Sequence, residues 1–209
     1  MSELLLSLII VGVVAIITVP VLINNVQKKL FATQLKNFVA QIEQLAQDEL
    51  LTHRTRDLSN TDFADPELLL SDKHFEIAKI CSAKTALSDC WKTTAKRKNK
   101  IKYKRIDRNN VTPQAGYTVI LKNGLMFRYT PSSLTGAFAI DINGNDKPNV
   151  AGRDYFIFYV NSKGHVIDYN VLLKTNYSLS TLITKCTSQS SPTPWCYAAL
   201  VENNWKMDY

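Results

Sequence analysis

The first twenty residues constrain this chain more than any other stretch. Between Glu3 and Pro20 the only polar side chains are those of Ser7 and Thr18, and none carries a charge. A helix rises ~1.5 Å per residue, so with the apolar positions beyond Pro20 this stretch can cross most of a ~30 Å hydrocarbon layer. A carboxylate beside a membrane segment is costly unless a cation meets it, which makes Glu3 a candidate functional residue.

The helical pattern continues past Pro20. Proline removes one backbone donor, so Pro20 should kink the helix rather than end it. A signal peptide would need a basic leading region and a small-x-small cleavage site, and the segment has neither, so we favour a retained helix of about 50 residues. Its second half should be one-sided, because apolar residues recur every three to five positions. These residues are Val26, Leu30, Leu35, Phe38, Val39, Ile42, Leu45, Ala46 and Leu50.

The rest of the chain predicts a short helix and then strands. Asp65-Pro66 followed by Glu67 predicts a second helix over about 66–80. After Pro113 the pattern changes, and Asn123-Gly124 between two apolar runs predicts a hairpin. We expect an antiparallel meander of four or five strands whose apolar face covers the amphipathic half of the first helix, which gives an α+β fold. Its strands are expected at 117–122, 125–130, 137–141, 155–160 and 165–169.

Four cysteines form two sequence-local pairs, Cys81/Cys90 and Cys186/Cys196. An even count behind a membrane segment is typical of disulfides in an oxidising compartment. Three pairings are formally open, as are four free thiols; the two local pairs are favoured because both loops are short. Neither pair has CxxC spacing and the three histidines are widely separated, so the sequence gives no indication of a zinc site.

The first fifty residues resemble the N-terminal segment of type IV pilins and type II secretion pseudopilins. The resemblance rests on Glu3, the Leu4-Leu5 that follows it, the uncharged run and Pro20 seventeen residues after Glu3. It implies a pilin-like fold of the whole chain and a role for Glu3 in pairing with the N-terminal amine of a neighbouring subunit. Two unlike charges in a low-dielectric bundle hold register, because a one-turn slip leaves both unpaired.

The resemblance also implies processing and topology. In this family a basic leader ending in glycine is cut before a phenylalanine that is then N-methylated, and that position falls just before Met1. Two alternatives follow: the reading frame continues upstream, or the chain is not processed. Lys28 and Lys29 argue for one orientation by the positive-inside rule. The cysteines argue for the other, with an extracytoplasmic head, and we give them more weight.

A polar loop, DINGNDKPNVAGRD, is a candidate calcium site. Oxygen ligands at alternate positions are what Ca²⁺ requires, and two glycines permit sharp turns. No glutamate closes the loop as in an EF-hand, although some pseudopilins resemble it in carrying a calcium-stabilised loop. A turn built from Asn, Asp and Gly alone remains the other interpretation. The candidate ligands are Asp141, Asn143, Asn145, Asp146, Asn149 and Asp154.

A basic patch carries much of the net charge of +7, since nine Lys or Arg residues fall between Lys92 and Arg108. Such a patch can neutralise phosphates, but only one aromatic residue interleaves it, so we favour a solvated or partner-facing surface over nucleic-acid binding. No catalytic motif is present, and we do not expect an enzyme. The patch residues are Lys96, Arg97, Lys98, Lys100, Lys102, Lys104 and Arg105.

Together these features divide the chain into three parts. Residues 1–25 are the membrane and filament-core half of the first helix, residues 26–52 its amphipathic half, and residues 53–209 the head domain. The resemblance implies a filament subunit drawn from the inner membrane, with other subunits, a prepilin peptidase and an assembly platform as partners. A non-polymerising membrane-anchored binding module and a DNA-binding minor pilin are the alternatives.

Overall fold

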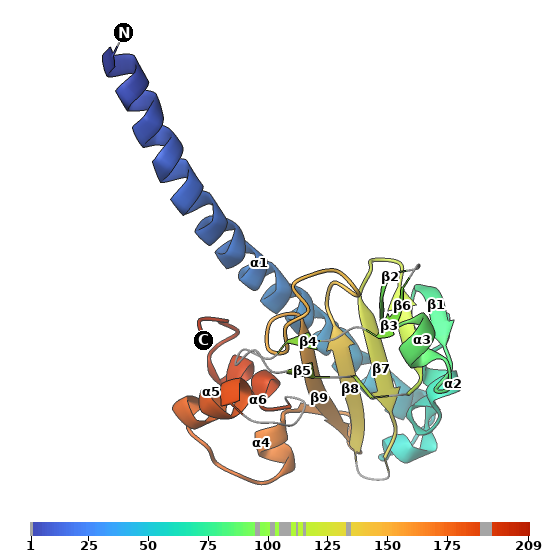
Figure 1. Cartoon of the computed structure of the whole chain (residues 1–209). Helices are drawn as coiled ribbons and strands as arrows, with labels where there is room; N and C mark the ends of the chain where they lie inside the picture. Colours follow the sequence, from blue (N-terminus) through green and yellow to red (C-terminus); the bar gives the residue numbers. More distant parts are fainter. Residues whose placement is uncertain are drawn as a thin grey trace.

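The computed structural model describes residues 2–94, 97–100, 103–104, 110–111, 113–114, 116–132, 135–188 and 194–209. One long helix, α1 (Ser2–Thr52), projects from a head that contains the remaining described elements (Figure 1). The helix has 51 residues and continues through Pro20, as the sequence predicts. Only its C-terminal half lies within the head, and its N-terminus ends far from it (Figure 1).

The head is built on a six-stranded antiparallel sheet with the order β1-β6-β7-β8-β9-β10. From β6 to β10 each strand pairs with the next in the chain, so the predicted meander is confirmed, and β1 is the one strand of the sheet that was not predicted. The Asn123-Gly124 hairpin is also confirmed, with Val119 opposite Phe127. The strands are β1 (Ile77–Cys81), β6 (Thr118–Leu121), β7 (Met126–Thr130), β8 (Thr135–Asp141), β9 (Tyr155–Asn161) and β10 (Val166–Ile167).

The helix expected over 66–80 is wrong beyond its first turn. Asp65 caps α2 (Pro66–Leu69) by accepting the backbone N–H of Glu67, but the helix ends at Leu69. Residues 77–81 instead form β1, which pairs with β6. A strand that gains a partner and a disulfide at Cys81 outweighs a weak local helix propensity.

Alternating residues of the strands build two cores, one on each face of the sheet. The face toward α1 buries Phe127, Phe138 and Phe158, and the ring of Phe38 from α1 lies 4.9 Å from that of Phe127. The opposite face buries Met126, Ala139, Tyr155 and Ile157 beneath Trp91. This period of two is the pattern of a sheet covered on both sides.

Short elements complete the head. The C-terminal helices lie beside α1 on the same face of the sheet, and the Tyr197 ring is 5.4 Å from that of Phe158. Both predicted disulfides, Cys81–Cys90 and Cys186–Cys196, are formed. The remaining elements are η1 (Leu58–Asn60), η2 (Asp62–Ala64), α3 (Ala86–Asp89), β2 (Lys92–Thr94), β3 (Arg97–Lys100), β4 (Tyr103–Lys104), β5 (Asn110–Val111), α4 (Tyr169–Leu172), α5 (Leu179–Ser188) and α6 (Pro194–Glu202).

Candidate functional site

The free half of α1 exposes apolar side chains on every side. Consecutive residues from Leu8 to Val11 are each more than half exposed, and Ile16 is 75 % exposed. Burying a side chain of this size is worth about 1.5–3 kcal/mol, so a surface like this marks contact with a membrane or another protein. Among the described residues α1 is the one helix long and apolar enough to cross a membrane, a property that membrane anchors share with signal sequences.

The exposure of α1 changes abruptly at Phe31. Leu30 is half exposed, whereas Phe31, Leu35 and Ile42 are buried in the core of the head. At about 1.5 Å per residue, the exposed stretch from residue 7 to residue 30 is about 35 Å long, close to the thickness of a hydrocarbon layer. The predicted amphipathic face is therefore confirmed from Leu35 onward, while Val26 belongs to the free half.

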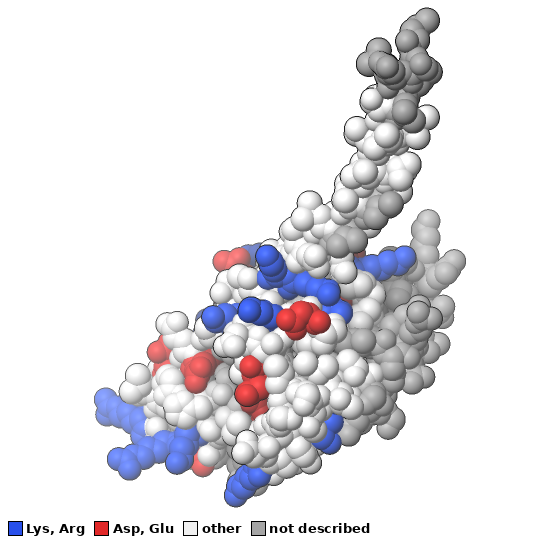
Figure 2. Space-filling view, turned by 90° about the vertical axis from the view of Figure 1, so that its left-hand side faces the viewer, with Lys and Arg blue, Asp and Glu red and all other residues white. Residues whose placement is uncertain are grey.

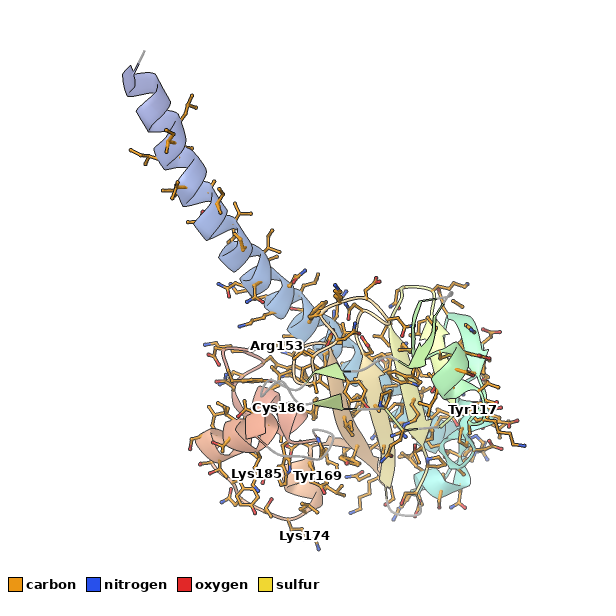
Figure 3. The ribbon with its side chains drawn as sticks, in the orientation of Figure 1. Tyr117, Arg153, Tyr169, Lys174, Lys185 and Cys186 are labelled. Atoms are coloured by element: carbon orange, nitrogen blue, oxygen red, sulfur yellow. A yellow bond between two sulfur atoms is a disulfide. The ribbon has the colours of Figure 1, made fainter. Side chains whose placement is uncertain are left out.

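Basic side chains gather on the head at the base of the free half of α1 (Figure 2). Arg153 lies there (Figure 3). The Arg153 guanidinium donates to the main-chain oxygens of Met207 and Tyr209, which ties the C-terminus to this region. Cations at this level suit the anionic headgroups of a membrane surface.

Glu3 and Pro20, the predicted assembly residues, lie on the free half of α1. The Glu3 backbone is helical, but its side chain lies outside the described residues. Pro20 is exposed and makes no contact with the head. An assembly role for these two residues stays a prediction.

In the candidate calcium loop, two carboxylates make contacts that hold turns. Asp141 is fully buried, and its Oδ1 accepts the Asn143 N–H at 3.2 Å. The Asp154 oxygens accept the N–H groups of Asn149 (2.5 Å) and Val150 (2.7 Å). Burial raises the pKa of Asp154 to about 6, against the opposing effect of these hydrogen bonds. Asp146 is exposed.

Three amides of the same loop present oxygens without partners. The Oδ1 atoms of Asn143, Asn145 and Asn149 are buried and accept no hydrogen bond among the described residues. The Asn145 Nδ2 donates to the Cys90 carbonyl at 2.7 Å, which fixes the direction of that amide. A buried oxygen without a partner costs about 1–3 kcal/mol, and a bound cation would remove that cost. The donor set therefore fits Ca²⁺, with Asp141 as the buried charge.

The loop is also held at both ends by close packing. Gly144 has a positive φ, and a Cβ there would lie 2.7 Å from the Gly124 carbonyl oxygen of the β6–β7 turn. A Cβ on Gly152 would lie about 3 Å from the sulfurs of Cys186 and Cys196. The loop thus connects the hairpin turn to the C-terminal disulfide, and its conformation affects both.

The basic patch is described only in part. Lys96, Lys102 and Arg105 lie outside the described residues. The backbones of Arg97, Lys98 and Lys100 belong to β3 and that of Lys104 to β4, so the described parts of the stretch are short paired strands. Whether the patch contacts a partner stays a prediction.

One polar cluster was not predicted from the sequence. Glu49 and His53, one turn apart near the end of α1, meet Asp62 of η2 and His74 of the segment before β1. The spacing of four between Glu49 and His53 on a helix was a readable signal, because such residues share one helix face. Nothing local indicated that Asp62 and His74 fold back onto them.

Comparison of the chain with models of protein families, with curated proteins and with solved structures finds no match. Three features of the chain itself therefore indicate its function. They are a helix that is half free and half buried, two disulfides, and a loop with unsatisfied amide oxygens.

Proposed function

We propose that this protein is a structural subunit of a type IV pilus or a type II secretion pseudopilus. The observation that carries the proposal is the division of α1 at Phe31 into a free apolar half and a half buried in the head. A subunit that must first reside in a membrane and then pack into a helical bundle needs such a helix. The bilayer and the neighbouring helices would cover the same apolar side chains in turn.

The proposal includes a pilin-like head outside the cytoplasm. Disulfides persist in oxidising compartments, and both pairs lie in the head. The chain would be a single-pass protein of the inner membrane, with its head in the periplasm before assembly and on a periplasmic or cell-surface filament afterwards. The basic side chains at the base of the free half would then lie at the level of the headgroups.

Glu3 would set the register of assembly. A carboxylate inside an apolar helical bundle is stable only beside a cation, and the resemblance to pilins supplies the N-terminal amine of the neighbouring subunit. Partners would be other pilin or pseudopilin subunits, the inner-membrane assembly platform and a prepilin peptidase. The role that we propose for this chain itself is structural.

The test is the substitution Glu3→Ala. We expect the variant to remain inserted in the membrane, because the apolar segment is unchanged. We also expect it to be missing from filaments, whether these are surface filaments recovered by shearing or pseudopili formed in the periplasm when the subunits are overproduced. Immunoblots of the membrane and filament fractions make the comparison. Glu202→Ala, which removes an exposed carboxylate at the end of α6, is the matched control. Incorporation of the Glu3→Ala variant into filaments at the wild-type level would contradict the proposal.

The free half of α1 equally supports a membrane-anchored binding module that does not polymerise. The two functions differ in what precedes Met1. A basic leader ending in Gly-Phe upstream favours the pilin, because that leader directs processing, and a reading frame without one favours the anchor.

We also propose that the loop from Asp141 to Asp154 holds a structural Ca²⁺. The support is the set of three buried amide oxygens, those of Asn143, Asn145 and Asn149, that accept no hydrogen bond among the described residues. The loop that carries them begins at a buried carboxylate, Asp141. The ion would be held by these oxygens and would fix a loop that joins the hairpin turn to the C-terminal disulfide.

A further inference from the structure

Two histidines and two carboxylates from three separate segments converge at the end of α1. Glu49 comes from the last turn of the helix, His53 directly follows the helix, Asp62 comes from η2 and His74 from the segment before β1. Each imidazole faces both carboxylates. The separations are 3.3 Å from His53 Nε2 to Glu49 Oε2, 3.7 Å from His53 Nε2 to Asp62 Oδ1, 3.8 Å from His74 Nε2 to Glu49 Oε1 and 3.0 Å from His74 Nε2 to Asp62 Oδ2.

The two shorter separations, 3.0 Å from His74 to Asp62 and 3.3 Å from His53 to Glu49, are close to the distance between neighbouring ligand atoms of a metal site. Zinc bonds to nitrogen and oxygen are about 2.0–2.1 Å, so neighbouring ligand atoms of a tetrahedral site lie about 3.3 Å apart. The ligand atoms of Glu49, Asp62 and His74 all lie within 4.8 Å of one another. His53 Nε2 faces the other oxygen of each of these carboxylates, Glu49 Oε2 and Asp62 Oδ1.

The side chains of Glu49, Asp62 and His74 are largely buried and are held in place by hydrogen bonds. The side chains of Glu49 and His74 are 4 % and 5 % exposed, and that of Asp62 is 14 % exposed. The backbone N–H of Asp62 donates to Glu49 Oε2 at 3.1 Å, which orients that carboxylate. Two nearly buried carboxylates side by side require a cation, since an unpaired buried charge is strongly destabilising.

A cation already occupies part of this position. The Lys73 Nζ lies 2.7 Å from Asp62 Oδ2 and 3.5 Å from Glu49 Oε1. The Lys73 side chain is 59 % exposed, however, so it can leave for solvent when another cation arrives.

We propose that Glu49, His53, Asp62 and His74 form a zinc site that fastens the end of α1 to the segment between η2 and β1, with Lys73 as a displaceable competitor. Imidazole ligands select zinc over calcium and magnesium, which prefer oxygen alone. Two of the three histidines of the chain meet here, although 21 positions separate them. The site is distinct from the calcium loop and does not depend on filament assembly.

The test is a titration of the full-length, disulfide-bonded chain in detergent micelles with Zn²⁺, after treatment with a chelator. Isothermal calorimetry should show one bound ion, and Co²⁺ in its place should give the intense visible absorption of a tetrahedral site. His74→Asn should weaken binding by more than about a hundredfold, since even outer partners of metal ligands contribute about 10–100-fold. His165→Asn is the matched control, because His165 faces a single carboxylate, Glu43.

Lys73→Met separates a metal site from a network of ion pairs. The Lys73 side chain is 59 % exposed, and His53 and His74 still face both carboxylates in this variant, so we expect it to fold. Removal of the competitor should tighten zinc binding by about twofold to fivefold, the worth of an exposed ion pair. A wild-type chain that binds no zinc overturns the proposal. So does binding that survives His74→Asn, that is lost in His165→Asn, or that weakens in Lys73→Met.

Discussion

At the scale of single residues, the asparagines of the loop from Asp141 to Asp154 are the most informative. An amide offers two donors on one side and an acceptor on the other, so fixing one end directs the other. In Asn143 the Nδ2 donates to the carbonyls of Asp146 and Lys147, and in Asn145 it donates to that of Cys90. The Oδ1 atoms of both residues are buried and accept no hydrogen bond from the part of the chain that the structure describes. A loop stabilised only as a turn has no need for this arrangement.

We therefore predict that calcium stabilises the full-length chain. At a hundredfold excess over Kd, binding contributes about 2.7 kcal/mol, which should raise the thermal midpoint by about 5–10 °C. Differential scanning calorimetry in micelles, with calcium or with a calcium-selective chelator, measures the shift. Asp141→Asn should abolish it because the variant lacks the buried charge.

His74→Asn is the control for the calcium shift, since it alters the proposed zinc site and leaves the loop intact. A midpoint that is the same with calcium and with the chelator would identify the loop as a plain turn. A shift that is lost in His74→Asn would mean that the two sites had been confused.

At the scale of elements, α1 combines two environments in one continuous helix. Ile16 and Ile42 have the same side chain on the same helix, yet one is 75 % exposed and the other is fully buried. Helix propensity is therefore equal at the two positions, and any difference between them must come from packing in the head.

This pair gives a prediction with its own control. Ile42→Ala should lower the free energy of unfolding of the head by about 2–5 kcal/mol, because it leaves a cavity in the core. Ile16→Ala should change it by less than about 0.5 kcal/mol, as substitutions outside the core do. Urea denaturation of the full-length chain in micelles, followed by tryptophan fluorescence, measures both. Equal effects would show that the free half of α1 also packs on the head.

The sequence predicted the elements whose cause is local. The helix period and the Asn123-Gly124 turn need only neighbours in the chain, and both are present. Strand β1 was missed because its partner β6 lies about forty residues later, and short-range patterns contain no information on such pairing. For the same reason Glu49 and His53 were readable as one helix face, whereas the arrival of His74 was not.

At the scale of the whole molecule, the head is complete without the free half of α1. Every buried apolar residue of the described chain lies at Phe31 or beyond, and both disulfides are in the head. The free half leads away from the sheet and the C-terminal helices (Figure 1). The buried core and both disulfides of the described residues therefore lie outside the free half, which contributes no contact to them.

The last prediction follows from this separation. A chain reduced to residues 27–209 should fold, remain monomeric without detergent and unfold in urea with a free energy within about 0.5 kcal/mol of the full-length value, because no core contact is removed. Size-exclusion chromatography and urea denaturation test both parts. A chain reduced to residues 37–209 is the control: it loses Phe31, Ala32 and Leu35 from the core, and each large apolar side chain removed costs about 2–5 kcal/mol. Aggregation of the longer fragment, or equal stability of the two, would contradict a head whose core begins at Phe31.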